Sequence, residues 1–237
     1  MKTIYKVGFW SGVIASSATV AYCVVQILQL YGVFTYPLDE RFIYGTSLCI
    51  VVPFLLMMLA LHYVTSSAKR FWSHTALTFS TLYAVFVTAN YVVQLATVIP
   101  VTLEGNLNEV RVLQQTPHSM FWNFDAIGYI FMGFATLAAI PLFENRGFQK
   151  WVRMSFIAHA LVTPLISIVY FAPDYSYKLL ILGMPWGITA PLFMLLLAIY
   201  IKKSGAKHGR RHSQGEDFSF HDLRQTGNKG HVPSSAR

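Results

Sequence analysis

The chain has 237 residues, of which 54% are hydrophobic and only 12% are charged, and its net charge is +8. Its mean hydropathy is +0.47. Soluble domains carry about 25% charged residues, so this chain has too little charge to cover a water-soluble globule of its size. The composition excludes a disordered chain and a coiled coil, leaves almost no room for a soluble enzyme, and predicts a protein embedded in lipid.

Six apolar runs follow one another along the chain, each long enough to cross a bilayer as a helix. Arg153 is the one Lys, Arg or Glu within them. Because a helix satisfies its own backbone hydrogen bonds in lipid, we expect an all-α, polytopic membrane protein with a six-helix bundle over residues 1–201. The runs are 7–31, 43–65, 75–99, 122–143, 152–172 and 179–201.

Residues 202–237 differ in composition from the rest of the chain. They hold eight Lys and Arg against three Asp and Glu, with few large apolar side chains. Such a segment cannot bury a core, so we predict a disordered basic tail. A basic tail after a hydrophobic body favours an anionic lipid surface or a protein partner over nucleic acid.

The basic residues between the runs are sorted by side, which predicts the topology. Twelve of them lie before the first run or after even-numbered runs, and only Arg41, Arg111 and Lys178 lie on the other side. The positive-inside rule then places both termini in the cytoplasm of a multi-pass protein of the cell membrane. The twelve are Lys2, Lys6, Lys69, Arg70, Arg146, Lys150, Arg153, Lys202, Lys203, Lys207, Arg210 and Arg211.

Polar side chains within the runs gather towards the ends that this topology places outside. Gln26 lies in the first run, Asn90 and Gln94 in the third, and Asp125 opens the fourth. Asn90 and Gln94 are four residues apart and share a helix face. Two interpretations stay open: a water-filled pocket that faces outward, and amide side chains that pair between helices.

A further candidate set is His118, Trp122 and Asp125. If a helix begins at Pro117, these three side chains share one face, with His118 and Asp125 about 10 Å apart by helical rise. A histidine and a carboxylate at the mouth of a pocket indicate a proton-linked or cation-binding site. The alternative is an interfacial histidine and an aspartate that caps the fourth helix.

His159 lies within the fifth run, nearer the inner side, and is a separate candidate. The histidine spacing matches no common metal or haem ligand pattern, so we expect no metal site, and His159 is expected to bond a neighbouring carbonyl or hydroxyl. The two cysteines, Cys23 and Cys49, are expected to be packing residues. No cofactor and no catalytic residue can be identified from the sequence.

Two short motifs resemble a known group of proteins. The group consists of uncharacterised prokaryotic six-span membrane proteins without an assigned function. The resemblance therefore implies six spans and adds weight to His118, Asp125, Gly128 and Tyr129 as site candidates. The motifs are Pro117-His118 followed by Asp125-x-x-Gly128-Tyr129-x-x-Met132, and Trp186-x-x-Thr189-x-Pro191 followed by Lys202-Lys203.

Three hypotheses for the function follow, in order of preference. The first is small-ligand binding, transport or sensing through an outward-facing polar pocket. The second is a membrane-embedded enzyme that acts on a lipid or isoprenoid, with Asp125, His118 and His159 as the available acids and bases. The third is an interaction or assembly protein that docks through its basic tail. The oligomeric state is left open.

Overall fold

The computed structural model describes residues 2–176 and 178–226, and from residue 207 on it describes the backbone alone. Six helices are long and apolar enough to cross a membrane, which confirms the predicted all-α, six-span class. The helices are α1 (Lys2–Leu30), α2 (Leu38–Val64), α3 (Arg70–Val93), α6 (Met120–Ala139), α7 (Gly147–Phe171) and α8 (Leu180–Thr226).

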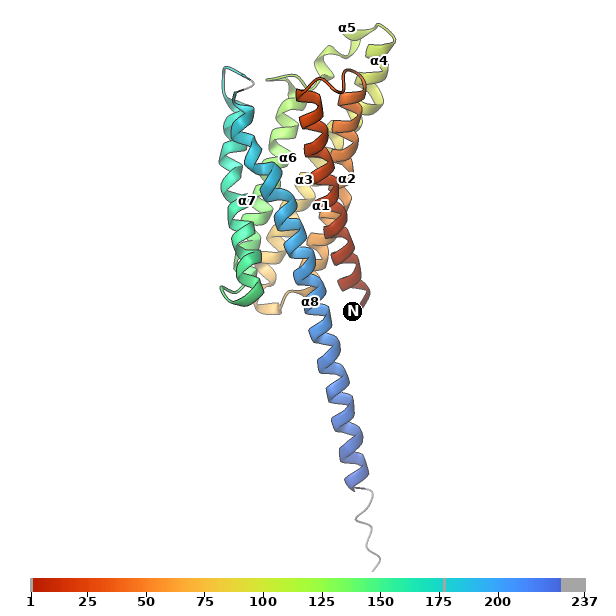
Figure 1. Ribbon diagram of the computed structural model, residues 1–237, viewed down its shortest axis with the longest axis vertical. Coiled ribbons are helices and arrows are strands. Elements are labelled where there is room, and N and C mark those ends of the chain that lie inside the picture. Colours follow the sequence, from red (N-terminus) through yellow and green to blue (C-terminus); the bar gives the residue numbers. More distant parts are fainter. Residues whose placement is uncertain (1, 177, 227–237) are drawn as a thin grey trace, which may run out of the picture.

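The six helices form a closed ring (Figure 1). Each packs mainly on its two neighbours, in the order α1, α2, α3, α6, α7, α8 and back to α1. A ring of this kind gives every helix one inward stripe and one outward face. The inward stripes make up a single core, which includes Phe54, Tyr83, Met132, Phe156 and Phe193.

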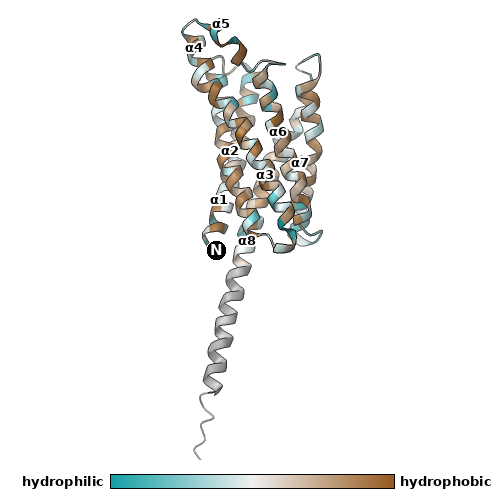
Figure 2. Cartoon of the chain, turned by 180° about the vertical axis from the view of Figure 1, so that it is seen from behind, coloured by the Kyte–Doolittle hydropathy of each residue, from teal (hydrophilic) through white to brown (hydrophobic). Residues whose placement is uncertain are grey.

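The outward faces are apolar along the length of the ring (Figure 2). On each of the six helices at least one aliphatic residue has half or more of its surface exposed. Exposed apolar surface of this extent is covered by lipid in a membrane protein, and the chain is an integral membrane protein. The six residues are Val20, Val52, Val85, Leu137, Leu161 and Ile188.

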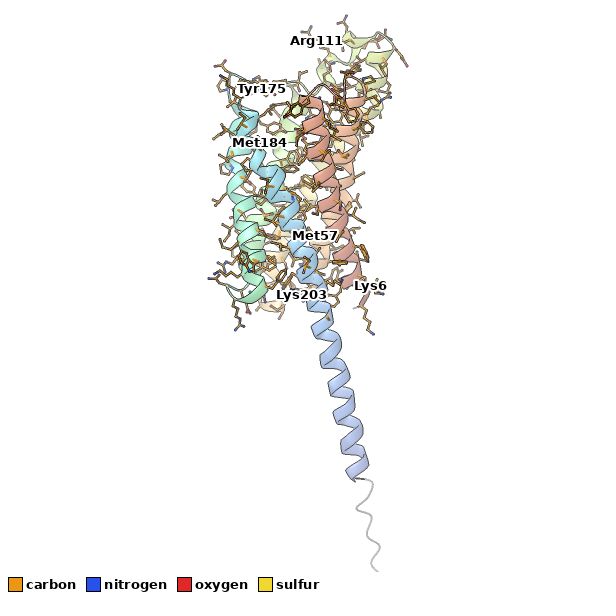
Figure 3. All side chains as sticks on the ribbon, viewed as in Figure 1. Lys6, Met57, Arg111, Tyr175, Met184 and Lys203 are labelled. Atoms are coloured by element: carbon orange, nitrogen blue, oxygen red, sulfur yellow. The ribbon has the colours of Figure 1, made fainter. Side chains whose placement is uncertain are left out.

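The two ends of the ring differ in what lies beyond them (Figure 1). One end, here called the N-terminal end, carries the start of α1 and the projecting part of α8. The other, here called the α4–α5 end, is topped by the short helices α4 (Ile99–Leu103) and α5 (Leu107–Val110). Figure 3 places Lys6 and Lys203 at the N-terminal end and Arg111 and Tyr175 at the α4–α5 end.

The third span is longer than the predicted 75–99. Beyond α3 the chain forms a π-helical turn, Gln94–Val98, and continues as α4 to Leu103. Pro100 follows the π turn, lacks a backbone N–H and collides with the carbonyl one turn earlier in a regular α-helix. A π turn moves that carbonyl aside, so the helix continues past the proline.

Helix α8 also differs from the prediction, because it does not end near residue 201 but is helical to Thr226. No proline follows Pro191 in this stretch to end the helix. Just past residue 201 the helix still packs on the ring: the ammonium of Lys202 lies 4.5 Å from the ring of Phe9, and that of Lys203 lies 3.9 Å from the ring of Phe148. The helix thus extends past the predicted end of the sixth span, the disordered basic tail expected over 202–237 stays a prediction, and residues 227–237 lie outside the described residues.

Candidate functional site

Asp125 is buried in the second turn of α6, within the ring and near its α4–α5 end. Its Oδ1 accepts a hydrogen bond from Nδ2 of Asn90, at 3.3 Å. Its Oδ2 accepts two, from the hydroxyl of Tyr170 at 2.5 Å and from Nε2 of Gln115 at 3.1 Å. One carboxylate thereby joins α6 to α3, to α7 and to the connection between α5 and α6.

Gln115 and Gln94 hold the whole segment between α4 and α6, residues 104–119, against the end of α3 and the π turn. Nε2 of Gln94 donates to the carbonyl of Leu113 at 2.7 Å, and the backbone N–H of Gln115 donates to Oε1 of Gln94 at 3.2 Å. Nδ2 of Asn90 donates to Oε1 of Gln115 at 2.9 Å. We call Asn90, Gln94, Gln115, Asp125 and Tyr170 the Asp125 cluster. Its buried side chains lie beneath a segment that covers the end of the ring.

The negative charge of Asp125 has no cationic partner in the described part of the chain. The salt bridge found there joins Arg146 to Glu144, at the opposite end of the ring. Buried carboxylates are normally paired with a cation or a metal, because hydrogen bonds alone rarely offset the loss of hydration. Asp125 is therefore a group that gains stability from a bound cation, including a proton.

Aromatic side chains surround the same region and come from all six helices of the ring. The hydroxyls of Tyr91 and Tyr129 are 2.9 Å apart. The ring of Trp186 meets those of Tyr129 and Tyr22 edge to face, with centroids 5.0 and 5.7 Å apart. We call this set the aromatic layer. Its members are Tyr22 of α1, Tyr44 of α2, Tyr83 and Tyr91 of α3, Tyr129 of α6, Tyr170 of α7 and Trp186 of α8.

Four residues of the inward stripes hold buried polar atoms with no hydrogen-bond partner among the described residues. These atoms are Oγ of Ser47, the hydroxyl of Tyr83, Oδ1 of Asn90 and Nε1 of Trp186. Native proteins leave few such groups unpaired, and each one calls for an explanation. Asn90 offers an acceptor and Trp186 a donor, so the ring interior has unused capacity for a ligand with both kinds of group.

The structure brings together only part of the predicted site. Asn90 bonds Asp125 directly, between α3 and α6, whereas Gln94 is linked to both only through Gln115. The outward-facing pocket and the pairing of amides between helices both stay open as interpretations. Gln26 does not join them: its Nε2 donates to the hydroxyl of Tyr22 at 2.9 Å, one turn away on α1. Gln115 was not predicted, because it lies in an irregular connection and no spacing relates it to Asp125.

The shared face of His118, Trp122 and Asp125 depended on a helix that begins at Pro117, and the structure does not meet this condition. Helix α6 begins at Met120, and Ser119 is its N-cap, with its hydroxyl accepting from the backbone N–H of Trp122 at 3.1 Å. Serine is a preferred N-cap, whereas His118 has a φ of +65° and cannot lie in the helix. His118 is exposed and shares no helix face with Asp125, and Asp125 does not cap the helix.

Trp122 acts on the cluster through Tyr170. Its indole N–H donates to the backbone carbonyl of Tyr170 at 3.0 Å, and the two ring centroids are 4.6 Å apart. The ring of Tyr175 also packs on Trp122, edge to face, with centroids 5.4 Å apart. Trp122 thereby fixes the end of α7 that presents the Tyr170 hydroxyl to Asp125.

His159 lies in the other half of the ring, buried against Phe193 with ring centroids 4.6 Å apart. The hydroxyl of Thr189 donates to the carbonyl of Pro185 at 2.9 Å, so it accepts from Nδ1 of His159 at 3.0 Å. This contact joins α7 to α8 and is of the kind expected for a packing histidine. Nowhere in the searched, described residues do three or more His, Cys, Asp or Glu side chains form a group that could hold a metal ion.

Comparison with protein-family models, with curated proteins and with solved structures gave no match to this chain. The resemblance to six-span prokaryotic proteins therefore rests on the two short motifs alone, and what the structure adds to it is the six-helix architecture.

Proposed function

We propose that this protein binds a small organic cation within the helix ring, at Asp125, and that it does so as a transporter or a sensor. The observation that carries the proposal is the buried Asp125 carboxylate, which no cationic side chain of the described residues contacts. Aromatic rings attract cations through their negative faces, by about 2 kcal/mol or more where water is excluded. The aromatic layer supplies such rings around the carboxylate.

The proposed access route is the α4–α5 end. Gln115 and Gln94 hold residues 104–119 over the site by four hydrogen bonds of ordinary length, which are exchangeable for bonds to water or ligand. The basic residues at the N-terminal end favour a cytoplasmic location for that end. With this orientation the site opens to the outside of the cell.

The alternative of a lipid-acting enzyme receives less support from the geometry. A groove on the outer surface lies between α6 and α7, with a volume of about 450 Å³. Its lining is apolar apart from Thr163 and Ser167, so it presents no general acid or base. Asp125 faces the ring interior instead. For the assembly alternative, the part of α8 beyond the ring is a candidate contact.

The test is a thermal-shift series on the purified full chain in detergent, with tetramethylammonium as probe and tert-butanol as an uncharged compound of similar size. The proposal expects tetramethylammonium, and not tert-butanol, to raise the unfolding temperature of the wild type. It expects Asp125→Asn to remove this rise, since the amide keeps the shape of the carboxylate without its charge. Equal shifts in the wild type and in Asp125→Asn would contradict the proposal.

A further inference from the structure

A second polar site lies at the N-terminal end of the ring, where α2 ends and α3 begins. A cavity of about 250 Å³ is lined there by His62, Tyr63 and Arg70. The ring of His74, one turn into α3, lies 5.8 Å from that of His62. The site is separate from the Asp125 cluster and plays no part in the proposed function.

The hydrogen bonds of Ser73 fix the tautomer of His62. The Ser73 hydroxyl donates its one proton to the carbonyl of Arg70, at 3.0 Å. Its oxygen must then accept from Nδ1 of His62, at 2.9 Å. Nδ1 therefore carries a hydrogen, and Nε2 is the nitrogen on which a second proton binds. When His62 is doubly protonated, Nε2–H is a charged donor for a ligand in the cavity.

The charge around this cavity is positive. Arg70 is exposed and its guanidinium forms no ion pair with any side chain that the structure describes, so its donors are available to a ligand. The neighbouring Lys69 is engaged, since its ammonium donates to the carbonyl of Leu142 at 2.9 Å. A guanidinium beside an imidazole matches an oxyanion, and the planar fork of arginine suits two phosphate oxygens in particular.

The position of the cavity indicates where such a phosphate comes from. The second span ends at Val64 and the third begins at Ser67, so His62 and Arg70 lie at the membrane surface, at the level of lipid headgroups. Exposed aromatic side chains flank them: Tyr63 is 66% exposed, Phe71 71% and Trp72 43%. Aromatic residues of this kind are typical of the membrane–water interface. Val52, further along α2, is 62% exposed and offers an apolar surface to an acyl chain.

We propose that Arg70 and His62 bind the headgroup phosphate of an anionic phospholipid in the cavity between the end of α2 and the start of α3. The acyl chains of that lipid run along the exposed faces of α2 and α3. Arg70 and His62 recognise phosphate oxygens, which inorganic phosphate offers as well as a lipid headgroup, so inorganic phosphate is the alternative ligand. The test separates the two.

The experiment is native mass spectrometry of the full-length protein in detergent, titrated with phosphatidylglycerol, with phosphatidylcholine and with inorganic phosphate. We expect phosphatidylglycerol to bind more tightly than phosphatidylcholine. Arg70→Ala is expected to weaken phosphatidylglycerol binding about tenfold, as the loss of a charge-assisted bidentate contact does. His62→Gln is expected to weaken it roughly threefold, since Gln keeps a donor but no charge.

Lys150→Ala is the matched control, because it removes one exposed positive charge at the same end of the ring without touching the cavity. It is expected to change binding less than about twofold, as an exposed charge does. An equal loss in Lys150→Ala and Arg70→Ala would overturn the proposal and indicate general charge attraction. Inorganic phosphate that binds and displaces the lipid would overturn the lipid assignment. If Arg70→Ala does not fold, Arg70→Lys keeps the charge without the fork and is expected to show an intermediate loss.

Discussion

The two halves of the ring interior are built from different chemistry. Towards the α4–α5 end the inward stripes carry Asp125, its amide partners and the aromatic layer. Polar atoms of Ser47, Tyr83, Asn90 and Trp186 have no hydrogen-bond partner there among the described residues. Towards the N-terminal end the inward stripes carry closely packed rings: Phe193 lies edge to face with Phe54 at 6.1 Å and with Phe156 at 5.1 Å. The polar half can exchange its hydrogen bonds, whereas the apolar half can open only by breaking tight packing.

The apolar half is expected to carry the stability of the ring, and the polar half the proposed exchange of ligand. Small residues reinforce the apolar half, since a Cβ on Gly8 would lie 2.6 Å from Cβ of Ala60, and a Cβ on Gly12 would lie 2.7 Å from that of Ala198. Such contacts bring α1 close to α2 and α8 in a way that larger side chains prevent. Substitutions in this half should reduce the free energy of unfolding, and those in the polar half should change access and binding.

The largest expected effect is that of Phe193→Ala in the apolar half. Phe193 is fully buried between Phe54 and Phe156, and a buried Phe→Ala change costs about 3–5 kcal/mol. Unfolding in detergent, followed by circular dichroism, measures the loss. Ile188→Ala is the control on the same helix, because Ile188 is 71% exposed towards lipid. Equal losses in the two variants would show that the apolar half does not stabilise the ring.

Asp125→Asn is expected to weaken tetramethylammonium binding by roughly tenfold or more, because the cation loses its contact with a charged carboxylate in a place without water. The fold should be retained, since the amide oxygen still accepts from Tyr170. Titration of the unfolding temperature with tetramethylammonium measures the effect. Asp39→Asn is the control, because Asp39 is also buried near the α4–α5 end but accepts from Gln29, at 2.9 Å, outside the cluster. An effect of Asp39→Asn as large as that of Asp125→Asn would place the cation elsewhere.

Gln115→Ala is expected to make the polar half more accessible from the α4–α5 end. The change removes the side-chain hydrogen bonds to Asn90 and Asp125, which lowers the free energy of opening residues 104–119 by about 1.4 kcal/mol. The population of the open segment, and with it the labelling rate, then rises roughly tenfold. A cysteine at Ser47, placed in a Cys23→Ser/Cys49→Ser background, reports the labelling rate with a membrane-impermeant maleimide.

Two controls accompany this labelling experiment. Gln114→Ala alters the neighbouring amide, for which no side-chain hydrogen bond is described, and should leave the rate unchanged. A cysteine at Ser80 lies in the deeper half of the ring and should stay unlabelled in every variant. Labelling at position 80 that rises together with that at position 47 would mean that the whole ring loosens rather than its polar half.

The smallest expected effect on stability is that of Tyr83→Phe. The hydroxyl of Tyr83 is buried without a hydrogen-bond partner among the residues that the structure describes, so its removal should change the free energy of unfolding by less than about 0.5 kcal/mol. Tyr170→Phe, by contrast, removes the 2.5 Å bond to Asp125 and should cost about 1.5–3 kcal/mol, the range for hydrogen bonds to charged groups. Similar costs for both tyrosines would mean that the Tyr83 hydroxyl has a partner within the folded protein.

The sequence predicted the fold better than the site, for physical reasons. The spans follow from run length alone, because the bilayer sets the length of a helix that crosses it. Asn90 and Gln94 were paired correctly since helical periodicity relates residues four apart. Gln115 could not be found in this way, because its place depends on how residues 104–119 fold back over the ring. His118 could not be placed in this way, because its position relative to Asp125 depends on whether the helix begins at Pro117 or after Ser119, and Ser119 is the N-cap.

One consequence follows from the length of α8. This single helix contributes Trp186 to the aromatic layer and continues for 40 residues to Thr226, about 60 Å by helical rise. Lys202 and Lys203 contact rings on α1 and α7, so the helix has a point of support at the N-terminal end of the ring. A helix supported at that point acts as a lever arm. If a ligand bound at the proposed site tilts the part of α8 that carries Trp186, the part of the helix beyond Lys203 tilts with it, in the opposite direction.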